Sequence, residues 1–427
     1  MSSQWPEVVV KEVCESVVDC VNKTAPVVDY ITPYRMIRTT NVKNGTVNLE
    51  GARYVTQEVY EKWTRRVVPQ YGDVILTREA PLGEVGMLKS NEKIFLGQRL
   101  MQYRANPEKL NNHFLLYALQ ESFMQGQIRA SGSGSTVEHM RVGDAENLKI
   151  KLPHIEVQHK IASILSAYDD LIENNNRRIV ILEEMARSLY REWFVKFRFP
   201  GHEEVKMVDS ELGQIPEGWS ILKVDQLVDF HIGGGWGQEK PDEKHSQPAY
   251  VIRGTDINHV THGNSSVIPY RFHSVSNLKS RKLEIGDIVF EVSGGSKGQP
   301  VGRALLVSKK LLNNLHEDVM CASFCKLIRG NNIVPAEYFY LHLKEIYDNG
   351  QIDKYQVQST GITNFKFQVF LEQETVLIPP EAILKKFIQP IQSFFDQINV
   401  LGFKNLNLKT QRDMLLPKLI SGKIPVI

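Results

Sequence analysis

The chain has 427 residues, of which 42% are hydrophobic and 23% charged, and its 51 basic and 49 acidic residues give a formal net charge of +2. This composition is typical of a globular protein and excludes a disordered, collagen-like or disulfide-stapled chain. The sequence has no apolar run long enough to cross a membrane and no N-terminal signal peptide, so we expect a cytoplasmic protein of two to four domains.

Catalytic signatures of several common enzyme classes are absent from the sequence. It contains no GxxxxGK[ST] phosphate-binding loop, no HExxH zinc helix and no GxSxG nucleophile motif. Cys321 and Cys325 lie on one face of an alternating, strand-like run over residues 319–327. With His316 they would offer at most three local ligands, so we interpret both cysteines as small buried thiols and expect no metal site.

An internal repeat organises the chain. Residues 37–42 (IRTTNV) are matched 215 positions later by residues 252–257 (IRGTDI). Residues 71–76 (YGDVIL) are matched 214 positions later by residues 285–290 (IGDIVF). Loop insertions account for the drift in offset. Each copy covers about 150–175 residues, which is enough for a hydrophobic core of its own.

Each copy mixes strand-like and helix-like segments. The Gly-Asp pair is followed by a β-branched run, a glycine-containing turn and a second apolar run, residues 83–88 and 301–306, which predicts paired strands. Leucine, tyrosine and phenylalanine recur at helical spacing over residues 111–120 and 336–346, which predicts short helices. We therefore expect each copy to be a globular α+β domain.

A long amphipathic helix is predicted at the end of each copy. The first covers about residues 156–194. The second is expected to hold Pro390 in its first turn and to end at Pro417, because proline interrupts helical hydrogen bonding. Apolar residues recur in alternating steps of four and three, which is a heptad repeat. The predicted coiled-coil seam consists of Ile161, Leu165, Tyr168, Ile172, Ile179, Leu182, Leu189 and Trp193, and of Phe387, Ile391, Phe394, Ile398, Leu401, Leu408, Leu415 and Leu419.

This period of 3.5 residues favours pairing of the two helices with each other. The alternative is that each helix packs on its own domain. Asn175 and Asn405 occupy seam positions, as polar residues that set the register of coiled coils do. We expect two repeated α/β domains separated by a long antiparallel two-helix coiled coil, in a pseudo-two-fold arrangement.

Three segments resemble the specificity subunits of type I restriction–modification systems. They are residues 187–201 (RSLYREWFVKFRFPG), 212–219 (LGQIPEGW) and 415–424 (LLPKLISGKI). The resemblance implies a first target-recognition domain over residues 1–152, a central helix over residues 153–205, a second target-recognition domain over residues 206–379 and a distal helix over residues 380–427.

The resemblance also implies a non-catalytic subunit of a DNA methyltransferase and endonuclease complex. Each target-recognition domain would read one half of a bipartite double-stranded DNA target. The coiled coil would set the unread spacer and dock two modification (methyltransferase) subunits, and restriction (translocase and endonuclease) subunits would join the complex. No cofactor is expected on this chain, since S-adenosylmethionine, ATP and Mg²⁺ belong to the partner subunits. No membrane partner is expected.

Sequence readout of DNA needs side chains that donate hydrogen bonds to base edges and accept hydrogen bonds from them. Polar, glycine-containing loops at equivalent points of the repeat are the candidates. Their DNA-binding residues are Arg38, Thr40, Arg78, Ser133, Ser135, Thr136 and Arg141 in the first copy, and Arg253, Thr255, Ser293, Ser296, Lys297, Ser359, Thr360, Thr363 and Lys366 in the second. The alternative is that these loops are solvated turns. We predict that Arg78→Ala weakens binding to one half-site.

Four residues near the end of the first long helix leave alternatives open. Tyr190 and Trp193 could stack on bases, but Trp193 lies on the heptad seam and Tyr190 beside it, which favours packing in the core. We expect Glu184 and Arg191 to be exposed on the surface that docks modification subunits. Charge reversal at either residue should then disrupt assembly without affecting the fold.

Two other functions remain as alternatives. A duplicated-domain nuclease would need clustered carboxylates near a metal ion, and Asp287 and Glu291 on one predicted strand are the nearest pair. No Glu-x-Lys sequence follows them. A coiled-coil adaptor that binds only proteins is the second alternative, and a salt-dependent, sequence-selective affinity for DNA would exclude it.

Overall fold

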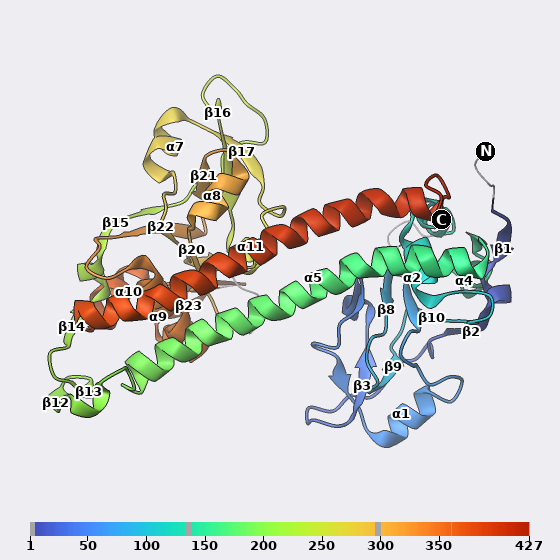
Figure 1. The fold of residues 1–427 in the computed structure, drawn as a ribbon, viewed down its shortest axis with the longest axis horizontal. Helices are drawn as coiled ribbons and strands as arrows, with labels where there is room; N and C mark the ends of the chain where they lie inside the picture. The colour runs from blue at the N-terminus through green and yellow to red at the C-terminus, as the bar shows by residue number, and fades with distance from the viewer. Residues whose placement is uncertain (1–4, 133–137, 295–299, 360, 427) are drawn as a thin grey trace. The chain divides into compact units, whose positions relative to one another are not determined.

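The computed structural model describes residues 5–132, 138–294, 300–359 and 361–426. The chain divides into two compact units (Figure 1): unit 1 comprises Met1–Leu171 with Leu408–Ile427, and unit 2 comprises Ile172–Asn407. Each unit combines helices with sheets, which confirms the α+β class and the repeated domains. The exact domain boundaries and the coiled-coil spacer stay predictions. Among the described residues, no helix is long and apolar enough to cross a membrane.

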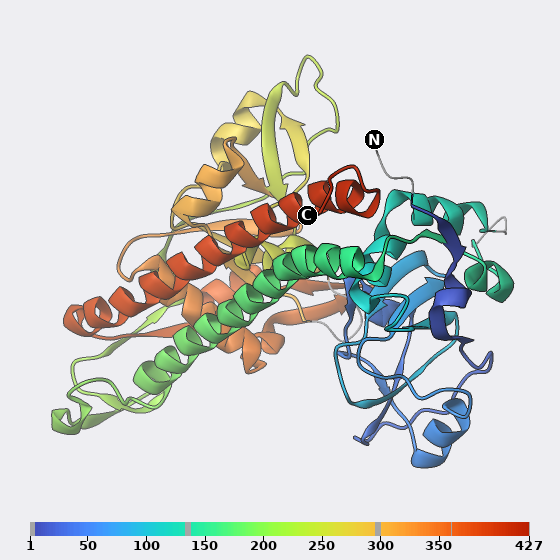
Figure 2. The ribbon, with the colours of Figure 1, turned by 45° about the vertical axis from the view of Figure 1, so that its right-hand side comes forward.

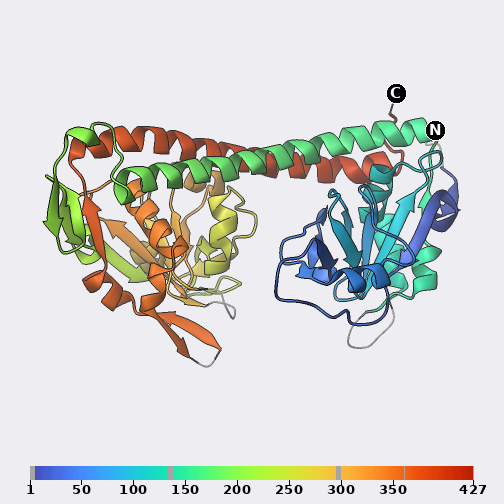
Figure 3. The same cartoon turned by 90° about the horizontal axis from the view of Figure 1, so that it is seen from below.

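Unit 1 is built on a six-stranded sheet. Its strands, in spatial order, are β2 (Cys14–Asp19), β10 (Leu100–Ala105), β7 (Val74–Arg78), β8 (Leu82–Met87), β5 (Gly45–Val47) and β4 (Val42–Lys43). Two smaller sheets order β6 (Arg53–Tyr54), β3 (Tyr34–Ile37) and β9 (Lys93–Leu96), and pair β1 (Glu7–Val9) with β11 (Lys149–Lys151). The short helices are α1 (Gln57–Trp63), α2 (Asn112–Gln120), α3 (Ser122–Ala130) and α4 (Val142–Glu146). Figure 3 shows the strands of this unit on one side of its part of α5.

Unit 2 contains a four-stranded sheet in the order β15 (Val228–Gly233), β22 (Cys325–Gly330), β18 (Ile288–Glu291) and β20 (Ala304–Leu306). Two three-stranded sheets order β17 (Tyr270–His273), β16 (Gln247–Ile252) and β21 (Val319–Cys321), and β19 (Ser293–Gly294), β24 (Ile362–Phe365) and β23 (Gln356–Ser359). Strands β16 and β17 stand side by side in Figure 2. Two pairs join β12 (Met207–Ser210) to β13 (Gly213–Pro216), and β14 (Ser220–Lys223) to β25 (Thr375–Ile378).

The short helices of unit 2 are α6 (Ile257–Thr261), α7 (Val275–Arg281), α8 (Lys309–Leu315), α9 (Ala336–Asp348) and α10 (Phe367–Gln373). Helices α2 and α9 confirm the two short helices predicted from residue spacing. The long helices are α5 (Ile155–Tyr190), which a π-helical turn (Arg191–Val195) extends, and α11 (Glu381–Ile420).

The internal repeat is visible in the strand order. The antiparallel series β2-β10-β7-β8 of unit 1 corresponds to β15-β22-β18-β20 of unit 2. A parallel pair accompanies each series, β3 with β9 in unit 1 and β16 with β21 in unit 2. The first sequence match begins at the last residue of β3 and of β16 and covers the 3-10 turn that follows, and the second covers the start of β7 and of β18. The duplication predicted from the sequence is therefore a duplication of topology.

The repeated Gly-Asp pair has the same structural role in both units. Gly72 and Gly286 have φ angles of +89° and +90°, a backbone conformation that only glycine adopts without strain. Asp73 accepts hydrogen bonds from Nε and Nη2 of Arg104 at 2.9 and 2.8 Å. Asp287 accepts the same pair of bonds from Arg329, both at 2.8 Å. Each bidentate pair ties the start of one strand to the neighbouring strand.

The predicted single strand over residues 319–327 is wrong. Ala322 donates its backbone N–H to Ile252 and accepts the N–H of Cys325, so the chain turns between β21 and β22, which belong to different sheets. Cys321 and Cys325 are both 0% exposed within one apolar cluster, which confirms their interpretation as buried thiols. Burial raises the pKa of Cys321 to about 12.

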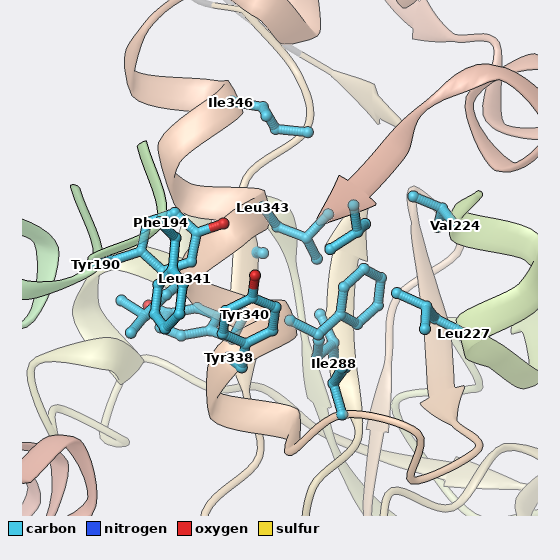
Figure 4. Packing of buried hydrophobic residues seen from close by; sticks show 14 of the residues in the cluster. Tyr190, Phe194, Val224, Leu227, Ile288, Tyr338, Tyr340, Leu341, Leu343 and Ile346 are labelled. Atoms are coloured by element: carbon cyan, nitrogen blue, oxygen red, sulfur yellow. The ribbon is translucent and has the colours of Figure 1, made fainter. Parts of the chain in front are cut away.

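Aromatic and aliphatic side chains from several elements meet in the main core of unit 2 (Figure 4). Tyr190 and Phe194 come from the end of α5 and its π-helical turn, and they pack against Tyr338 of α9 and Phe387 of α11. Tyr190 is 5% exposed, and Trp193 packs against the same cluster. Core packing is therefore confirmed for Tyr190, and Trp193 packs against the same core while it stays half-buried.

The two expectations about prolines in α11 are wrong. Pro390 lies in the third turn rather than the first, and the helix continues past Pro417. Each proline removes one helical hydrogen bond, but burial of neighbouring residues opposes that loss. Phe387 and Ile391 are 0% exposed in unit 2, and Leu419 is 3% exposed in unit 1.

Within unit 2, α5 and α11 run antiparallel and share an apolar cluster. The cluster consists of Ile179, Leu182, Ile398 and Leu401. Beyond it, Asn175 Nδ2 donates to Asn405 Oδ1 at 2.8 Å, and Asn405 Nδ2 donates to Asn176 Oδ1 at 2.8 Å. Of the other predicted seam residues, Ile161, Leu165, Phe387, Ile391 and Leu419 are buried, and Tyr168, Ile172, Leu189, Trp193, Phe394, Leu408 and Leu415 are half-buried.

Candidate nucleic-acid interface

Two of the predicted DNA-binding loops lie side by side in unit 1. The first follows β7, and the second precedes α4 and β11. The backbone N–H of Met140 donates to Arg78 O at 2.9 Å, and Glu79 forms a β-bridge with His139. Arg78 Nη1 donates in turn to Met140 O at 2.9 Å. These bonds bring Arg78 and Arg141 into one neighbourhood.

The corresponding two loops also meet in unit 2. Ser293 of β19 pairs with Asn364 of β24, and Gly294 pairs with Thr363. The Ser293 hydroxyl donates to Asn364 Oδ1 at 2.8 Å. Loops that are about 55–70 residues apart in the sequence are thus joined at equivalent points of both units, as expected for a duplicated binding surface.

Arg78, which the sequence placed in a loop, belongs to strand β7, and the turn begins after it. Thr77 and Arg78 belong to the strand and are 0% and 6% exposed. The Thr77 hydroxyl donates to Pro81 O at 2.6 Å and accepts the backbone N–H of Glu84 at 2.9 Å, so it closes the hairpin. Arg78 therefore faces a protein environment and holds the neighbouring loop, while Arg141 is exposed.

A pocket in unit 1 collects polar side chains from four separate segments, and we call it the Arg99 pocket. Its lining residues are Asp19, Asn22, Arg78, Glu79, Gln98, Arg99, His139, Arg141 and Val142. Arg99 forms an ion pair with Glu79 at 3.3 Å, and His139 contacts the same carboxylate at 3.3 Å. The pocket combines cationic, anionic and amide groups, the mixture that can read base edges.

Sequence reasoning missed Gln98 and Arg99. Both lie in the turn between β9 and β10, and both are exposed. The available signal was a polar Gly-Gln-Arg break between two apolar strand-like runs. The sequence could have marked this turn as a loop, but it could not place it beside the turn after β7.

The predicted loops that contain Arg38 and Arg253 have a structural role in both units. Asn41 Oδ1 accepts the backbone N–H of Arg38 at 2.8 Å. In unit 2, Asp256 accepts hydrogen bonds from Nε and Nη2 of Arg253 at 2.8 and 2.7 Å, which raises the pKa of Arg253. Thr40 and Thr255 are exposed. The threonines are thus more accessible than the arginine side chains, which are partly buried.

Some of the remaining predicted DNA-binding residues are described by the structure, and the others lie outside the described residues. Lys366 is exposed before α10, and Thr363 is half-buried in β24. Ser133, Ser135, Thr136, Ser296, Lys297 and Thr360 lie outside the described residues, and so does the side chain of Ser359.

The two carboxylates considered for a nuclease site are each held by an arginine. Glu291 accepts hydrogen bonds from Nε and Nη2 of Arg303 at 2.8 and 2.6 Å, and Asp287 accepts those of Arg329. Both carboxylates are at most 2% exposed. Buried, bidentate pairing of this kind is a structural use of the carboxylates.

The surface of α5 in unit 2 differs from expectation at one residue. Glu184 is exposed, as expected, and pairs with Arg187 at 2.7 Å. Arg191, in contrast, is partly buried and forms an ion pair with Glu345 of α9 at 2.7 Å. The prediction that Arg191 is freely exposed is wrong, because α9 packs against the π-helical turn.

Comparisons with known proteins point to one family. The family model described as "Type I restriction modification DNA specificity domain" matches residues 2–184. The MjaIX specificity subunit of Methanocaldococcus jannaschii is 26% identical over 390 residues, covering 88% of this chain and 83% of that protein. The HindI specificity subunit of Haemophilus influenzae is 22% identical over 360 residues, covering 73% and 76%.

A solved structure shows the same fold. The S subunit of a type I restriction–modification system from M. genitalium aligns with a TM-score of 0.54 and 15% sequence identity. The alignment covers 99% of this chain and 96% of that one. At this identity the likeness supports the architecture, and the residues of any interface must be argued from this chain alone.

Proposed function

We propose that the chain is a specificity subunit of a type I restriction–modification system, as the family match over residues 2–184 and the similar specificity subunits support, and that each unit reads one half of a bipartite DNA target. The observation that carries this proposal is that the same two polar loops are joined to each other in both units. The loop after the Gly-Asp strand meets the loop before the last strand in unit 1, through Glu79 and His139, and in unit 2, through Ser293 and Asn364. Two such surfaces on one chain suit an asymmetric, two-part target.

We further propose that the long helices set the spacing between the half-sites and dock two modification subunits. Support comes from the asparagine contact and apolar cluster between α5 and α11 in unit 2. A polar pair in an otherwise apolar seam favours one register over others. A defined register is what a fixed unread spacer requires.

The chain is proposed to act without catalysis of its own. Its partners in that assembly are methyltransferase subunits and restriction subunits with translocase and endonuclease activity. S-adenosylmethionine, ATP and Mg²⁺ would be bound by those partners, and the complex would work in the cytoplasm. The pairing of Asp287 and Glu291 with arginines leaves the nuclease alternative without its nearest carboxylate pair.

Methylation mapping tests the proposed function. The chain is expressed with its cognate modification subunit in a methylation-free host, and N6-methyladenine is located across the genome. We expect one bipartite motif with a fixed gap, and the modification subunit alone provides the control. Random methylation, or none despite a stable complex, would overturn the recognition role and favour an adaptor.

Matched substitutions in the two units sharpen this test. Arg141→Ala in unit 1 and Lys366→Ala in unit 2 each remove one exposed cation near the joined loops. Each variant should weaken recognition of a different half-site and leave the other unchanged. Loss of the same half-site in both variants would contradict the assignment of one half to each unit.

The docking proposal has a separate test. Glu184→Lys reverses an exposed charge on α5, whereas Glu58→Lys makes the same change on α1 of unit 1. We expect Glu184→Lys to reduce co-purification of the modification subunit and Glu58→Lys to leave it intact. Equal yields from both variants would remove this face of α5 from the docking surface.

A further inference from the structure

We propose that the Arg99 pocket of unit 1 reads base edges, and that Gln98 and Arg99 determine specificity at one half-site. This inference rests on the proposed function, and it adds residues that neither the repeat nor the predicted loops contained. Its basis is the construction of the pocket, the backbone of Arg99 and the chemistry of the lining groups.

The pocket is assembled from segments that are distant in the sequence. Asn22 follows β2, Glu79 follows β7, Gln98 and Arg99 connect β9 to β10, and Arg141 precedes α4. Strands β2, β10 and β7 are hydrogen-bonded neighbours in one sheet. The sheet therefore supplies a rigid platform that fixes the spacing of these side chains, as precise recognition requires.

The backbone of Arg99 is held in an uncommon conformation. Its φ angle is +72°, in the left-handed region that non-glycine residues rarely adopt. Its carbonyl accepts the backbone N–H of Arg78 at 2.8 Å, which locks the turn against β7. Strained residues of this kind persist where the surrounding structure holds them, and they concentrate at functional sites.

The lining charges suit base edges better than a phosphate. Glu79 lies between Arg99 and His139, and Asp19 is also in the lining, so the pocket offers acceptors beside the donors of its arginines, whereas a phosphate would use the donors alone. Base edges present donors and acceptors together. Arginine pairs with guanine, asparagine and glutamine pair with adenine, and glutamate accepts from cytosine.

Two lining side chains are available for contact with a base edge. Asn22 and Gln98 are exposed, and their side chains make no hydrogen bond within the described part of the chain. Arg78 also lines the pocket, but it is 6% exposed and donates to Met140 O, so it supports the wall of the pocket. The amide groups of Asn22 and Gln98 can therefore exchange water for the donors and acceptors of a base.

The test uses the full complex with its modification subunit and three variants. Gln98→Ala and Arg99→Ala change the pocket, and Arg65→Ala removes an exposed arginine that lies outside the pocket lining. Methylation mapping gives the motif. Binding of matched DNA and of DNA with single base changes, each at several salt concentrations, separates base contacts from phosphate contacts.

We expect the pocket variants to relax one or two base positions of a single half-site, with the gap and the other half-site unchanged. Discrimination against the wrong base should fall roughly 10-fold to 100-fold for each variant. Arg65→Ala should keep the wild-type motif. Gln98→Ala keeps the test valid if Arg99→Ala alters the turn, because no described hydrogen bond depends on the Gln98 side chain.

Two results would overturn the inference while leaving the proposed function intact. Uniform weakening on all sequences, with a shallower salt dependence, would show a phosphate contact. An unchanged motif and affinity in both pocket variants would show that the pocket does not touch DNA. Failure of the wild-type complex to give any motif would instead overturn the proposed function itself.

Discussion

Arg412 of α11 forms an ion pair with Asp169 of α5 within unit 1. The Tyr117 hydroxyl of α2 donates to the same carboxylate at 2.6 Å. Arg412 occupies a position where the heptad pattern calls for an apolar residue, and the pair explains this departure. The side chains of Arg412 and Asp169 are 18% and 24% exposed, so the contact is largely shielded from water.

Arg412→Met should destabilise unit 1 despite restoring an apolar seam residue. The substitution leaves the Asp169 carboxylate partly buried, with the Tyr117 hydroxyl as its remaining side-chain donor in the described part of the chain. We therefore expect a loss of about 1–3 kcal/mol in the free energy of unfolding. Urea denaturation measures it. Arg65→Met, at an exposed site, is the control and should change stability by less than about 0.5 kcal/mol. A variant as stable as wild type would show that the ion pair contributes nothing net.

Breaking the Asp287–Arg329 pair should lower the free energy of unfolding more than Arg412→Met does. Asp287 is 1% exposed and joins the start of β18 to β22. Asp287→Ala removes both bonds to the Arg329 guanidinium, which keeps its contact with Glu284 at 3.2 Å, and it leaves the backbone N–H of Glu284 without its acceptor. We expect a loss of about 3–5 kcal/mol in the free energy of unfolding. Asp73→Ala should behave alike in unit 1, where Asp73 pairs with Arg104. A loss below about 1 kcal/mol at both sites would contradict a structural role for the repeated Gly-Asp pair.

Gly402→Ala should lower the stability of unit 2, whereas a change from glycine to alanine usually stabilises a helix interior. A Cβ at Gly402 would lie 2.2 Å from His262 O and 2.6 Å from Gly263 Cα, both in the loop after α6 of unit 2. We expect a loss of about 1–3 kcal/mol, because the backbone of that loop must move.

Gly126→Ala in α3 is the matched control for Gly402→Ala. Nothing lies within 4 Å of a Cβ at Gly126, which is exposed. Alanine should therefore stabilise that helix by up to about 1 kcal/mol. Thermal unfolding of the two variants measures whether each one loses or gains stability. Stabilisation by Gly402→Ala would refute the close approach of Gly402 to the loop after α6.

Acid should weaken unit 2 through His342. Burial lowers the pKa of His342 to about 4 from 6.5, and the Tyr190 hydroxyl lies 3.1 Å from its Nδ1. The unfolded chain therefore binds a proton more readily than the folded one. Stability from this residue is complete above about pH 6.5 and falls as the pH drops toward 4, by up to about 3 kcal/mol.

Comparison with His342→Gln isolates this contribution from those of other histidines. The stability difference between wild type and variant should shrink as the pH falls from 7 to 4.5, because the wild type alone carries the proton-linked loss. Urea denaturation at several pH values measures the difference. A difference independent of pH would show that His342 titrates normally in the folded state.

Local sequence determined the elements of this protein and their duplication. Heptad spacing marked about half of the residues that α5 and α11 bury, and the Gly-Asp pair marked the same strand in both units, because periodicity and backbone preference act over a few residues. Asn175 and Asn405 were recognisable as polar interruptions of an apolar period for the same reason, and the structure shows that they contact each other.

Tertiary structure alone decided which side chains meet. Arg78 is buried because a loop about 60 residues away covers it, and the Arg99 pocket exists because the sheet order β2-β10-β7 brings separate turns together. Helix α11 continues through two prolines because neighbouring apolar residues are buried in the cores of unit 1 and unit 2. These outcomes depend on contacts between distant segments, which no local pattern encodes.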